Sequence, residues 1–479
     1  MITITRRLAQ QFRAVLRRAL GQVRGGPVVG FVADKEGLTV KSAFGDIAIE
    51  LRVPGTRAAE TVWLPLSALD DFEGKKDDPV ELTATENGQV SAQWRDGNVP
   101  QIVEYHSAPP PDADKFPSLP TDFTVNQPGL LQSLHEASEV ADEGSVRFAT
   151  DCLQLTPDGT IHAADGHQAL VQTGCTFPWN EPLLVRRSKV FHSPEVPQDK
   201  PVSVARSGDW LAVHVDPWTI YLRINKDGRY PNMARVIPDP ANATTRCQLS
   251  IDDARFLADT LPRLPSQDET NLPVTLDLNG HVALRAKSAD QSKPTEVVLV
   301  NSHCTGDAVR INTNRTYLKR AMKLGLRELC LYGDGVALLG QSENRKLVWM
   351  PLEPGAAIEP SEDAIRIESP KGQANVAPSV STSPSPKPKT ERRSKPMSGP
   401  AATTNGHAPT ENTTAKPRRR KANQQDLGKL IDQAVAFRTA LHNLMHESGE
   451  LVKALKSHRR TSKAIQNALT SISQVKSLI

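Results

Sequence analysis

Hydrophobic and polar positions follow the same order three times within residues 1–355. In each repeat, an amphipathic segment with the period of an α-helix precedes two short segments of alternating apolar and polar residues joined by a glycine-containing turn. The helical segments are "RRLAQQFRAVLRRALGQV" (6–23), "PGLLQSLHEASEVA" (128–141) and "IDDARFLADTLPRL" (251–264), and the strand pairs after them are "PVVGFVADKEGLTVKSA" (27–43), "SVRFATDCLQLTPDGTIHAAD" (145–165) and "LPVTLDLNGHVALRAKS" (272–288).

Each repeat continues with a second short helix and a second hairpin, within residues 64–94, 185–215 and 314–341. Six copies of a helix followed by antiparallel strands, paired into three modules of about 118 residues, predict an α+β fold in which helices cover one face of each sheet. We expect three tandem domains, each with two helices packed on antiparallel sheets, at residues 1–118, 119–243 and 244–355.

The connector "DGRYPNMARVIPD" (227–239) does not fit either element. It lies between a strand-like run (218–224) and the third amphipathic helix, it has no regular period, and it contains two prolines. Proline fixes the backbone and lowers the entropy lost when a segment becomes ordered. The connector is therefore predicted to be an irregular, extended segment that forms part of a surface.

The chain changes character after residue 355. Residues 371–425 are mostly Pro, Ser, Thr, Ala, Lys and Arg, which cannot bury enough apolar surface to offset their ordering entropy. We expect a disordered linker over 356–425, whose run "KPRRRK" (416–421) is either a solvated charge run or a phosphate contact.

Residues 426–479 show a heptad pattern. The two series of core positions are Leu427, Ala434, Leu441, Ser448, Leu455, Ser462 and Leu469, and, three residues later in each heptad, Leu430, Phe437, Leu444, Leu451, His458, Ile465 and Ile472. Such a pattern predicts a coiled coil or a two-helix hairpin. The partner of this helical segment, a second copy or another protein, stays open.

Charge and cysteine content narrow the class of protein. Residues 371–479 hold 19 Lys and Arg against 6 Asp and Glu, a net charge of +13, whereas residues 1–370 carry a net charge of −9. The acidic body by itself indicates solubility, so a nucleic-acid role has to rest on local patches. The five scattered cysteines, without a CxxC pair, suggest reduced thiols, and no segment is apolar enough for a membrane span or a signal peptide. We expect a cytoplasmic protein.

Asp165 and His167, two residues apart in "AADGH", are the candidates for acid–base or metal chemistry. No third ligand or nucleophile motif accompanies them in the sequence, so we interpret Asp165 and Gly166 as a turn and His167 as a hydrogen-bonded wall residue. We predict no enzymatic activity, no cofactor and no metal.

Several motifs together resemble the bacterial DNA sliding clamp, the beta subunit of replicative DNA polymerase. They are "FPSLP" (116–120), "AADGHQAL" (163–170), "DGRYPNMARVIP" (227–238), "INTNRTYLKRAMKLG" (311–325) and "VWMPL" (348–352), and the resemblance covers about residues 1–353. It implies three clamp domains in a homodimer that closes head to tail into a ring around double-stranded DNA. For that dimer interface it suggests Ile102, Val103 and Tyr105 in the first domain and Leu261 and Leu264 in the third, although all five also fit ordinary core or edge packing.

A clamp that slides needs weak, sequence-independent attraction to phosphates, which Lys and Arg provide. Arg6, Arg13, Arg17 and Arg24 fall within about 40° of one another on the first helix at 100° per residue, opposite its apolar face. A solvated basic face is the alternative. The equivalent candidates elsewhere are Arg186, Arg187 and Lys189 in the second domain, and Arg315, Lys319, Arg320 and Lys323 in the third. In contrast, "LHEASEVADE" and "LSALDDFE" are acidic, which would make the lining of a ring only partly basic.

The resemblance also implies a groove that binds short peptides of DNA polymerase, the clamp loader and repair proteins. Its residues would be Thr150, Gly166, His167, Gln168, Ala169, Pro231, Arg235, Val236, Asn314, Tyr317, Val348, Trp349, Met350, Pro351 and Leu352. Gln168 replaces a usual arginine, Ala169 a usual leucine, and Thr150 an expected apolar residue. We therefore expect a wider and wetter pocket that Trp349 partly refills.

Two hypotheses follow from the sequence. The first is a ring-shaped sliding clamp that tethers DNA polymerase to its template. The second is a clamp-derived scaffold that acts through its basic linker and coiled coil without encircling DNA. The chain also continues for 127 residues beyond Leu352, near where the family ends, and this tail would leave the fold beside the groove.

Overall fold

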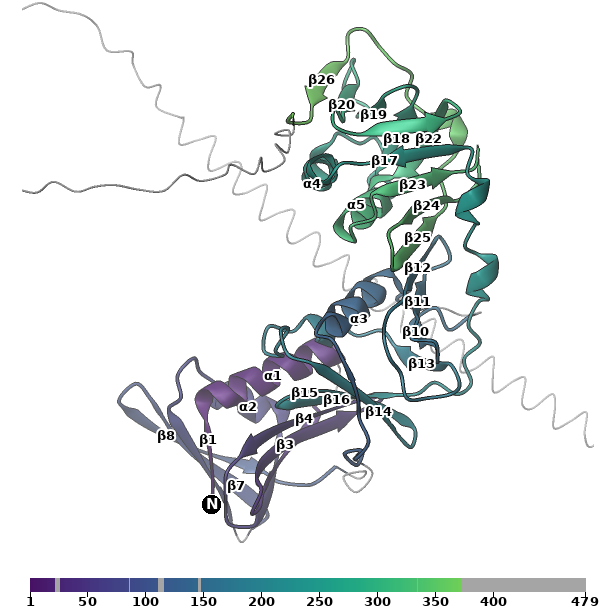
Figure 1. The fold of residues 1–479 in the computed structure, drawn as a ribbon. Helices are drawn as coiled ribbons and strands as arrows, with labels where there is room; N and C mark the ends of the chain where they lie inside the picture. The colour runs from purple at the N-terminus through teal and green to yellow at the C-terminus, as the bar shows by residue number, and fades with distance from the viewer. Residues whose placement is uncertain (22–25, 86, 111–115, 145–147, 334, 372–479) are drawn as a thin grey trace, which may run out of the picture. The chain divides into compact units, whose positions relative to one another are not determined.

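The computed structural model describes residues 1–371, except 22–25, 86, 111–115, 145–147 and 334. The chain divides into two units, Met1–Ser379 and Val380–Ile479, and all the described residues belong to the first (Figure 1). Most of the predicted linker and the whole predicted coiled coil therefore lie outside the described residues, as does Arg24.

The first domain confirms the predicted order of a helix followed by antiparallel strands. Its elements are β1 (Ile2–Thr5), α1 (Arg6–Leu20), β2 (Val28–Ala33), β3 (Gly37–Phe44), β4 (Ile47–Pro54), β5 (Glu60–Pro65), α2 (Leu66–Phe72), β6 (Pro79–Ala84), β7 (Gln89–Asp96) and β8 (Val99–His106). Thr5 caps α1 by accepting a hydrogen bond from the Leu8 N–H. The buried face of α1 consists of Ala9, Phe12, Val15 and Leu16, which recur at helical spacing.

The second domain repeats this plan with a shorter second helix. Its elements are β9 (Thr124–Asn126), α3 (Gly129–Val140), β10 (Cys152–Leu155), β11 (Ile161–Ala164), β12 (Gln168–Gln172), β13 (Leu183–Arg186), η2 (Lys189–His192), β14 (Val202–Ser207), β15 (Trp210–Val215) and β16 (Trp218–Arg223). The predicted second helix is only the 3₁₀ turn η2. Ser193 ends it, and Pro194 and Pro197 follow soon after, where proline cannot supply the N–H groups that a longer helix would need.

The third domain completes the series. Its elements, with two short turns of the connector, are η3 (Met233–Arg235), η4 (Pro240–Asn242), β17 (Thr245–Gln248), α4 (Ile251–Thr260), η5 (Leu261–Arg263), β18 (Pro273–Leu278), β19 (Val282–Ala286), β20 (Thr295–Val298), β21 (His303–Gly306), β22 (Val309–Asn314), α5 (Arg315–Lys323), β23 (Glu328–Leu331), β24 (Leu338–Gln341), β25 (Arg345–Trp349), η6 (Pro354–Ala356) and β26 (Ile365–Glu368). The last turn of the predicted helix becomes η5, which contains Pro262.

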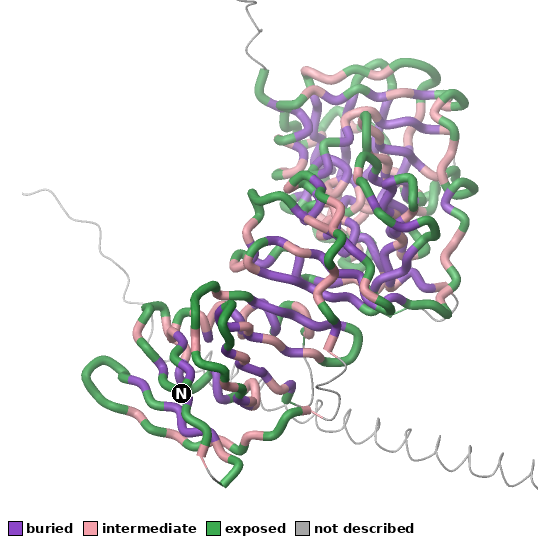
Figure 2. The backbone as a smooth tube through the Cα atoms, turned by 60° about the horizontal axis from the view of Figure 1, so that its bottom comes forward, coloured by how far each residue is buried: buried purple, intermediate pink, exposed green. Residues whose placement is uncertain are grey.

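Two sheets continue from one domain into the next. The strand order β5-β2-β3-β4-β16-β15-β14-β9 joins the first and second domains, and β13-β10-β11-β12-β25-β24-β23-β17-β21 joins the second and third. At the two seams, Tyr221 pairs with Ala48 and Ala169 pairs with Val348. Figure 2 shows that buried residues concentrate in the interior of the domains, while most of the connecting turns at the periphery are exposed.

Ordered structure continues past the predicted domain boundary at residue 355. The 3₁₀ turn η6 and strand β26 belong to the third domain, although residues 356–371 were assigned to the linker on composition. β26 is only four residues long, and it becomes a strand because it pairs with β20. Among the described residues, no helix is long and apolar enough to span a membrane.

Candidate functional site

Strands β12 and β25 come from different domains and bring the central residues of the site together. They run antiparallel with Ala169 opposite Val348, so these two side chains share one face of the sheet. The ladder continues past β25, because the Met350 N–H donates to the His167 carbonyl at 3.0 Å. Val348 and Met350 therefore face the same side, and the side chain between them points to the opposite side.

A tight turn before β12 forms one end of this site. The Asp165 carboxylate accepts hydrogen bonds from the N–H groups of His167 and Gln168, both at 2.8 Å, and Gly166 has a φ of +92°, which favours glycine. The sequence "AADGH" thus forms a turn, as the structural interpretation predicted. Among the described residues, no group of three or more His, Cys, Asp or Glu side chains is arranged to hold a metal ion.

The connector between the second and third domains forms the opposite wall. Tyr230 anchors it by packing against two apolar clusters of the second domain, which include Cys152 and Ala169. Asn232 then caps the short turn η3 by accepting from the Ala234 N–H at 3.1 Å. This turn directs Met233 toward the buried cluster, and Val236 remains 42% exposed.

A groove of about 370 Å³ lies between these walls. It is lined by the predicted residues Thr150, Gly166, His167, Gln168, Ala169, Pro231, Val236, Val348 and Met350. Sequence reasoning missed Asp142, Phe148, Ala164, Asp165, Met233 and Ala337, which also line it. Asp165, Ala164 and Met233 lie within motifs already identified, so adjacency to a predicted groove residue is the signal that would have found them.

The remaining predicted groove residues, Arg235, Asn314, Tyr317, Trp349, Pro351 and Leu352, do not line this cavity. Trp349 is completely buried and donates its indole N–H to Thr313 at 2.9 Å, so it does not refill the groove. The cause is strand alternation, which places Trp349 on the core face of β25. Asn314 is also structural, because it caps α5 by accepting from the Thr316 N–H.

An arginine from the third domain lies against the unusual Gln168. The Arg320 guanidinium donates to Gln168 Oε1 at 2.6 Å and to the Glu139 carbonyl at 3.1 Å. Gln168 in turn donates to Asp165 at 2.7 Å. Gln168, which was expected to make the pocket wetter, is therefore bonded on one side to an arginine from α5 and on the other to Asp165.

The arginines on α1 divide into two groups. Arg6 donates to the carbonyls of Phe72 and Glu73, and Arg13 forms ion pairs with Asp70 and Glu73, all within the first domain. Their side chains are only 14% and 12% exposed. In contrast, Arg17 is exposed, and among the described residues none forms a hydrogen bond or ion pair with its side chain.

Arg315 has a structural role rather than a place on the surface. It is 4% exposed, and its guanidinium donates to the carbonyls of Leu261, Leu264, Pro265, Leu272 and Pro273. These bonds hold the η5 turn and the start of β18 against α5. Arg315 is therefore removed from the candidate DNA contacts. On the same helix, Lys323 is exposed and Lys319 is half-buried.

The second-domain cations surround a pocket next to α1 and α5. Lys189 is exposed, whereas Arg187 donates to the Ala141 carbonyl at 3.0 Å. Together with Arg18, Arg320, His135 and His192, they line a pocket of about 460 Å³ that also contains Glu139. Arg186 lies elsewhere, in ion pairs with Asp46 and Asp151.

The acidic character of α3 is partly neutralised within the fold. Glu136 forms an ion pair with Arg345 at 3.0 Å, and burial raises the pKa of Glu136. Glu139 remains exposed beside the basic pocket. The pocket therefore combines several cations with one exposed acid.

Comparison with solved structures identifies the fold of this chain. The chain is similar to the DNA polymerase III subunit beta of Pseudomonas aeruginosa, with a TM-score of 0.58 and 18% identity over 74% of this chain and 99% of that one. It is also similar to the DNA polymerase sliding clamp of Bacillus subtilis, with a TM-score of 0.60 and 16% identity over 73% and 98% of the two chains. The chain has the fold of the bacterial DNA sliding clamp. No family model and no curated protein matches its sequence.

The clamp fold places the predicted interface residues differently in its two end domains. β8 is an edge strand of the first-domain sheet, with Ile102 65% exposed and with Val103 and Tyr105 packed against the core. In the third domain, Leu261 and Leu264 are 0% and 8% exposed. They belong to the core, because η5 folds back under α5, so they are not available as a surface for a second copy.

Proposed function

We propose that this protein is a DNA sliding clamp, a homodimeric ring that encircles double-stranded DNA and tethers DNA polymerase through the groove between β12, β25 and the connector. The clamp loader would open and close this ring, and the protein would act in the cytoplasm without enzymatic chemistry of its own. The observation that carries the proposal is the groove, because a clamp fold needs such a site to hold a partner protein.

The groove suits a short apolar peptide. Ala169, Val348 and Met233 form a buried apolar floor, while Val236 and Met350 remain partly exposed at its rim. An apolar side chain entering from a partner would be removed from water against these walls, which contributes about 25 cal/mol for each Å² buried. His167 and Thr150 supply polar groups at the edge, which suits the backbone of a bound peptide.

Five cations in three domains support sequence-independent DNA contact. They are Arg17 and Arg18 on α1, Lys189 on η2, and Lys319 and Lys323 on α5. Flexible side chains of this kind attract phosphates without reading bases, so binding weakens steeply with salt. This is the weak attraction that a sliding ring requires.

Retention on closed DNA tests this function directly. The full chain is loaded by the clamp loader of its own organism onto a nicked circular plasmid, and half of the sample is then linearised. We expect the protein to stay on the circle and to run off the linear DNA. Equal retention on both forms would show binding that is independent of topology, and the ring would then be rejected.

The second candidate, a scaffold that does not encircle DNA, is favoured by the ion pairs of Arg13 and by the net charge of −9 on residues 1–370. Both observations reduce the attraction between the folded domains and DNA. In this case the groove would still bind its partner, whereas the plasmid experiment would give the same low retention on circular and linear DNA.

A further inference from the structure

The third-domain sheet ends in a strand that comes from the chain beyond Leu352. The order of this sheet is β22-β18-β19-β20-β26, and β26 pairs in parallel with β20 at its edge (Figure 1). Ile365 N–H donates to the Pro294 carbonyl and Ser369 N–H donates to the Val298 carbonyl, both at 2.9 Å. The edge that β20 would otherwise present is therefore covered along its whole length.

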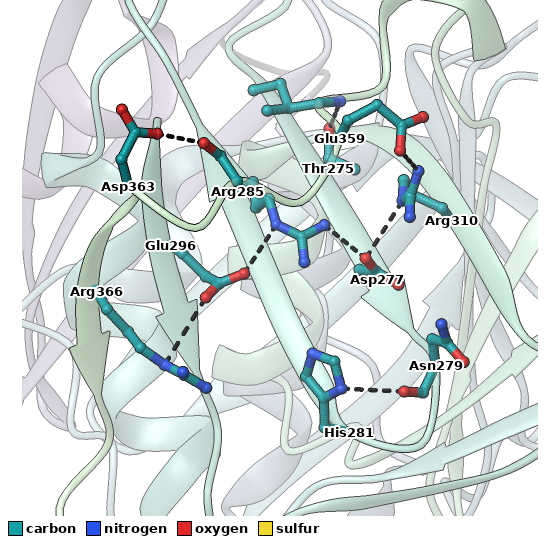
Figure 3. Close-up of polar contacts among 12 residues, drawn as sticks. Thr275, Asp277, Asn279, His281, Arg285, Glu296, Arg310, Glu359, Asp363 and Arg366 are labelled. Carbon is teal, nitrogen blue, oxygen red and sulfur yellow. Dashed lines mark hydrogen bonds and ion pairs between the residues drawn. The ribbon is translucent and has the colours of Figure 1, made fainter. Parts of the chain in front are cut away.

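A network of charged side chains fixes this added segment to the domain (Figure 3). Arg366 on β26 lies 3.7 Å from Glu296, which pairs with the buried Arg285 at 2.8 Å. Before β26, Glu359 forms an ion pair with Arg310. Arg366 and Glu359 are themselves 56% and 77% exposed, so these pairs orient the segment, and the backbone hydrogen bonds to β20 hold β26 in place.

The hydrogen-bonding direction alternates along β26, and this shows which of its backbone groups are not bonded to β20. Ile365 and Ser369 direct their N–H groups to β20, so the odd-numbered residues of this strand face β20. The backbone groups of Arg366 and Glu368 consequently point away from the sheet. Ile365 and Ile367 share the core face with Val297 but remain 52% and 39% exposed, because β26 is the outermost strand of this sheet in the described part of the chain.

Strand β8 of the first domain has a matching free edge. The Ser107 N–H donates to the Gly88 carbonyl at 3.1 Å, which places the odd-numbered residues of this strand toward β7. The backbone groups of Ile102 and Glu104 therefore point outward. The backbone of Pro100 also points away from β7, but proline has no N–H to donate. A second strand could therefore pair with β8 only at the residues after Pro100.

We propose that β8 of one copy pairs antiparallel with β26 of a second copy, so that the tail beyond Leu352 supplies the third-domain side of the subunit contact. This inference rests on the proposed ring and names the strand that closes it. Antiparallel pairing is the commoner arrangement in proteins. Only outward-facing residues can oppose each other, and this restricts the register to steps of two.

One register between β8 and β26 both pairs opposite charges and covers the exposed apolar side chains. It places Glu104 opposite Arg366, an opposite-charge pair of exposed side chains. On the core face, it sets Val103 beside Ile367 and Tyr105 beside Ile365, which covers the apolar surface that β26 leaves exposed. A shift of two residues in one direction would instead oppose Glu104 and Glu368, two like charges.

A charge-swap experiment on the full chain tests this contact. Sedimentation velocity over a range of concentrations gives the dimer dissociation constant of the wild type, Glu104→Arg, Arg366→Glu and the double variant. We expect each single variant to weaken the dimer at least tenfold and the double variant to recover most of that affinity. Glu81→Arg, at an exposed position on the central strand β6, is the matched control and should not change the constant.

The other outcomes separate this proposal from the ring itself. Unchanged dimers in all variants would overturn the β26 contact and leave the ring to another surface. A stronger dimer in Arg366→Glu, which also breaks the ion pair with Glu296, would overturn it by showing that β26 covers the edge that a second copy needs. A wild-type chain that is monomeric at every concentration would overturn both the contact and the ring.

Glu104→Pro provides a second variant that does not depend on charge alone. The Glu104 N–H points away from β7, so proline removes an outward donor while the β7 ladder keeps its bonds. We expect it to weaken the dimer more than Glu104→Gln does. An equal effect of the two substitutions would argue against backbone pairing at this edge.

Discussion

The groove residues, which the resemblance to the clamp family implies, and the basic helix residues, which follow from charge and helical spacing, have different outcomes in the structure. The central groove residues Gln168, Ala169 and Val348 come together on neighbouring strands. On the basic helices, Arg13 is paired with acids of its own domain and Arg315 is buried among carbonyl groups. The motif match thus brought these three groove residues together as predicted, whereas residue type along a helix did not show which arginines are free to bind a partner.

The reason lies in how each side chain finds its partner. In a strand, the side of the sheet is set by the backbone period of two, so a short side chain such as Ala169 has little choice of surroundings. Arginine has a long stem and five N–H donors, and it binds whichever carboxylate or carbonyl group is closest. Near α1 these groups are Asp70 and Glu73, which compete with any phosphate for Arg13.

Removing Arg315 should have the largest effect and should act on stability alone. In Arg315→Met, several buried carbonyls lose their donor, and each unsatisfied group costs about 1–3 kcal/mol, so we expect a loss of about 3 kcal/mol or more in the free energy of unfolding. Urea denaturation measures it. The control Lys323→Met, at an exposed position of the same helix, should stay within about 0.5 kcal/mol. Equal losses would show that Arg315 is not structural.

A charge at the rim of the groove should have the next largest effect. Met350→Glu places a carboxylate where an apolar peptide side chain would pack, and we expect at least tenfold weaker polymerase binding, about 1.4 kcal/mol. Met350 is 45% exposed, so folding should be unaffected. Surface plasmon resonance with the polymerase measures the change. Val300→Glu, at a 37% exposed position away from the groove, is the control.

Tyr317→Ala sharpens the same test, because Tyr317 was predicted to line the groove and does not. Burial raises the pKa of Tyr317, and the nearby Asp165 carboxylate raises it further. Its removal should weaken polymerase binding less than Met350→Glu does. A larger effect would place the bound peptide nearer α5 than the described cavity extends.

Repeated local patterns were sufficient to predict most of the fold. The period of 3.6 located α1, α3 and α4, and alternation around glycine turns located their strand pairs, because both patterns reflect which side of an element is buried. The segment containing β26 could not be found in this way. Its strand is four residues long, and its conformation depends on pairing with β20 and on ion pairs to Glu296 and Arg310, which are distant in sequence.

Local sequence patterns were also insufficient to place some single residues of the candidate site. The resemblance placed Trp349 in the groove, where it was expected to refill part of the pocket, but adjacent positions on a strand face opposite sides and Trp349 lies on the core face. Leu261 and Leu264 were predicted at an interface, although an apolar residue after a helix fits a core equally well. The sequence contains both alternatives, and only tertiary packing under α5 decides between them.

Substitutions of the exposed Arg17 and of the ion-paired Arg13 on α1 should have different effects on DNA binding. Arg17→Glu combined with Lys323→Glu should weaken binding and reduce the slope of log K against log salt by about one for each phosphate that is no longer bound. Arg13→Gln should leave that slope unchanged and lower stability instead, because it breaks two ion pairs within the first domain. Fluorescence anisotropy with labelled duplex DNA measures the slopes. Equal slopes for both variants would contradict this division of the α1 arginines.

Mild acid should have the smallest effect, and it should act on the pocket that α1, α3 and η2 line rather than on the groove. Burial lowers the pKa of His135, as does the neighbouring His192, whose ring stacks on it at 4.5 Å, and Glu139 only partly opposes this. Below an unfolded pKa of about 6.5, the unfolded chain therefore binds more protons than the folded one. The free energy of unfolding should fall as the pH drops from 7 to 5.

Denaturation of His135→Gln should show a weaker pH dependence than the wild type, whereas His303→Gln, at an exposed position on β21, should match the wild type. Identical pH profiles for the wild type and His135→Gln would show that protonation of this pair does not contribute to stability.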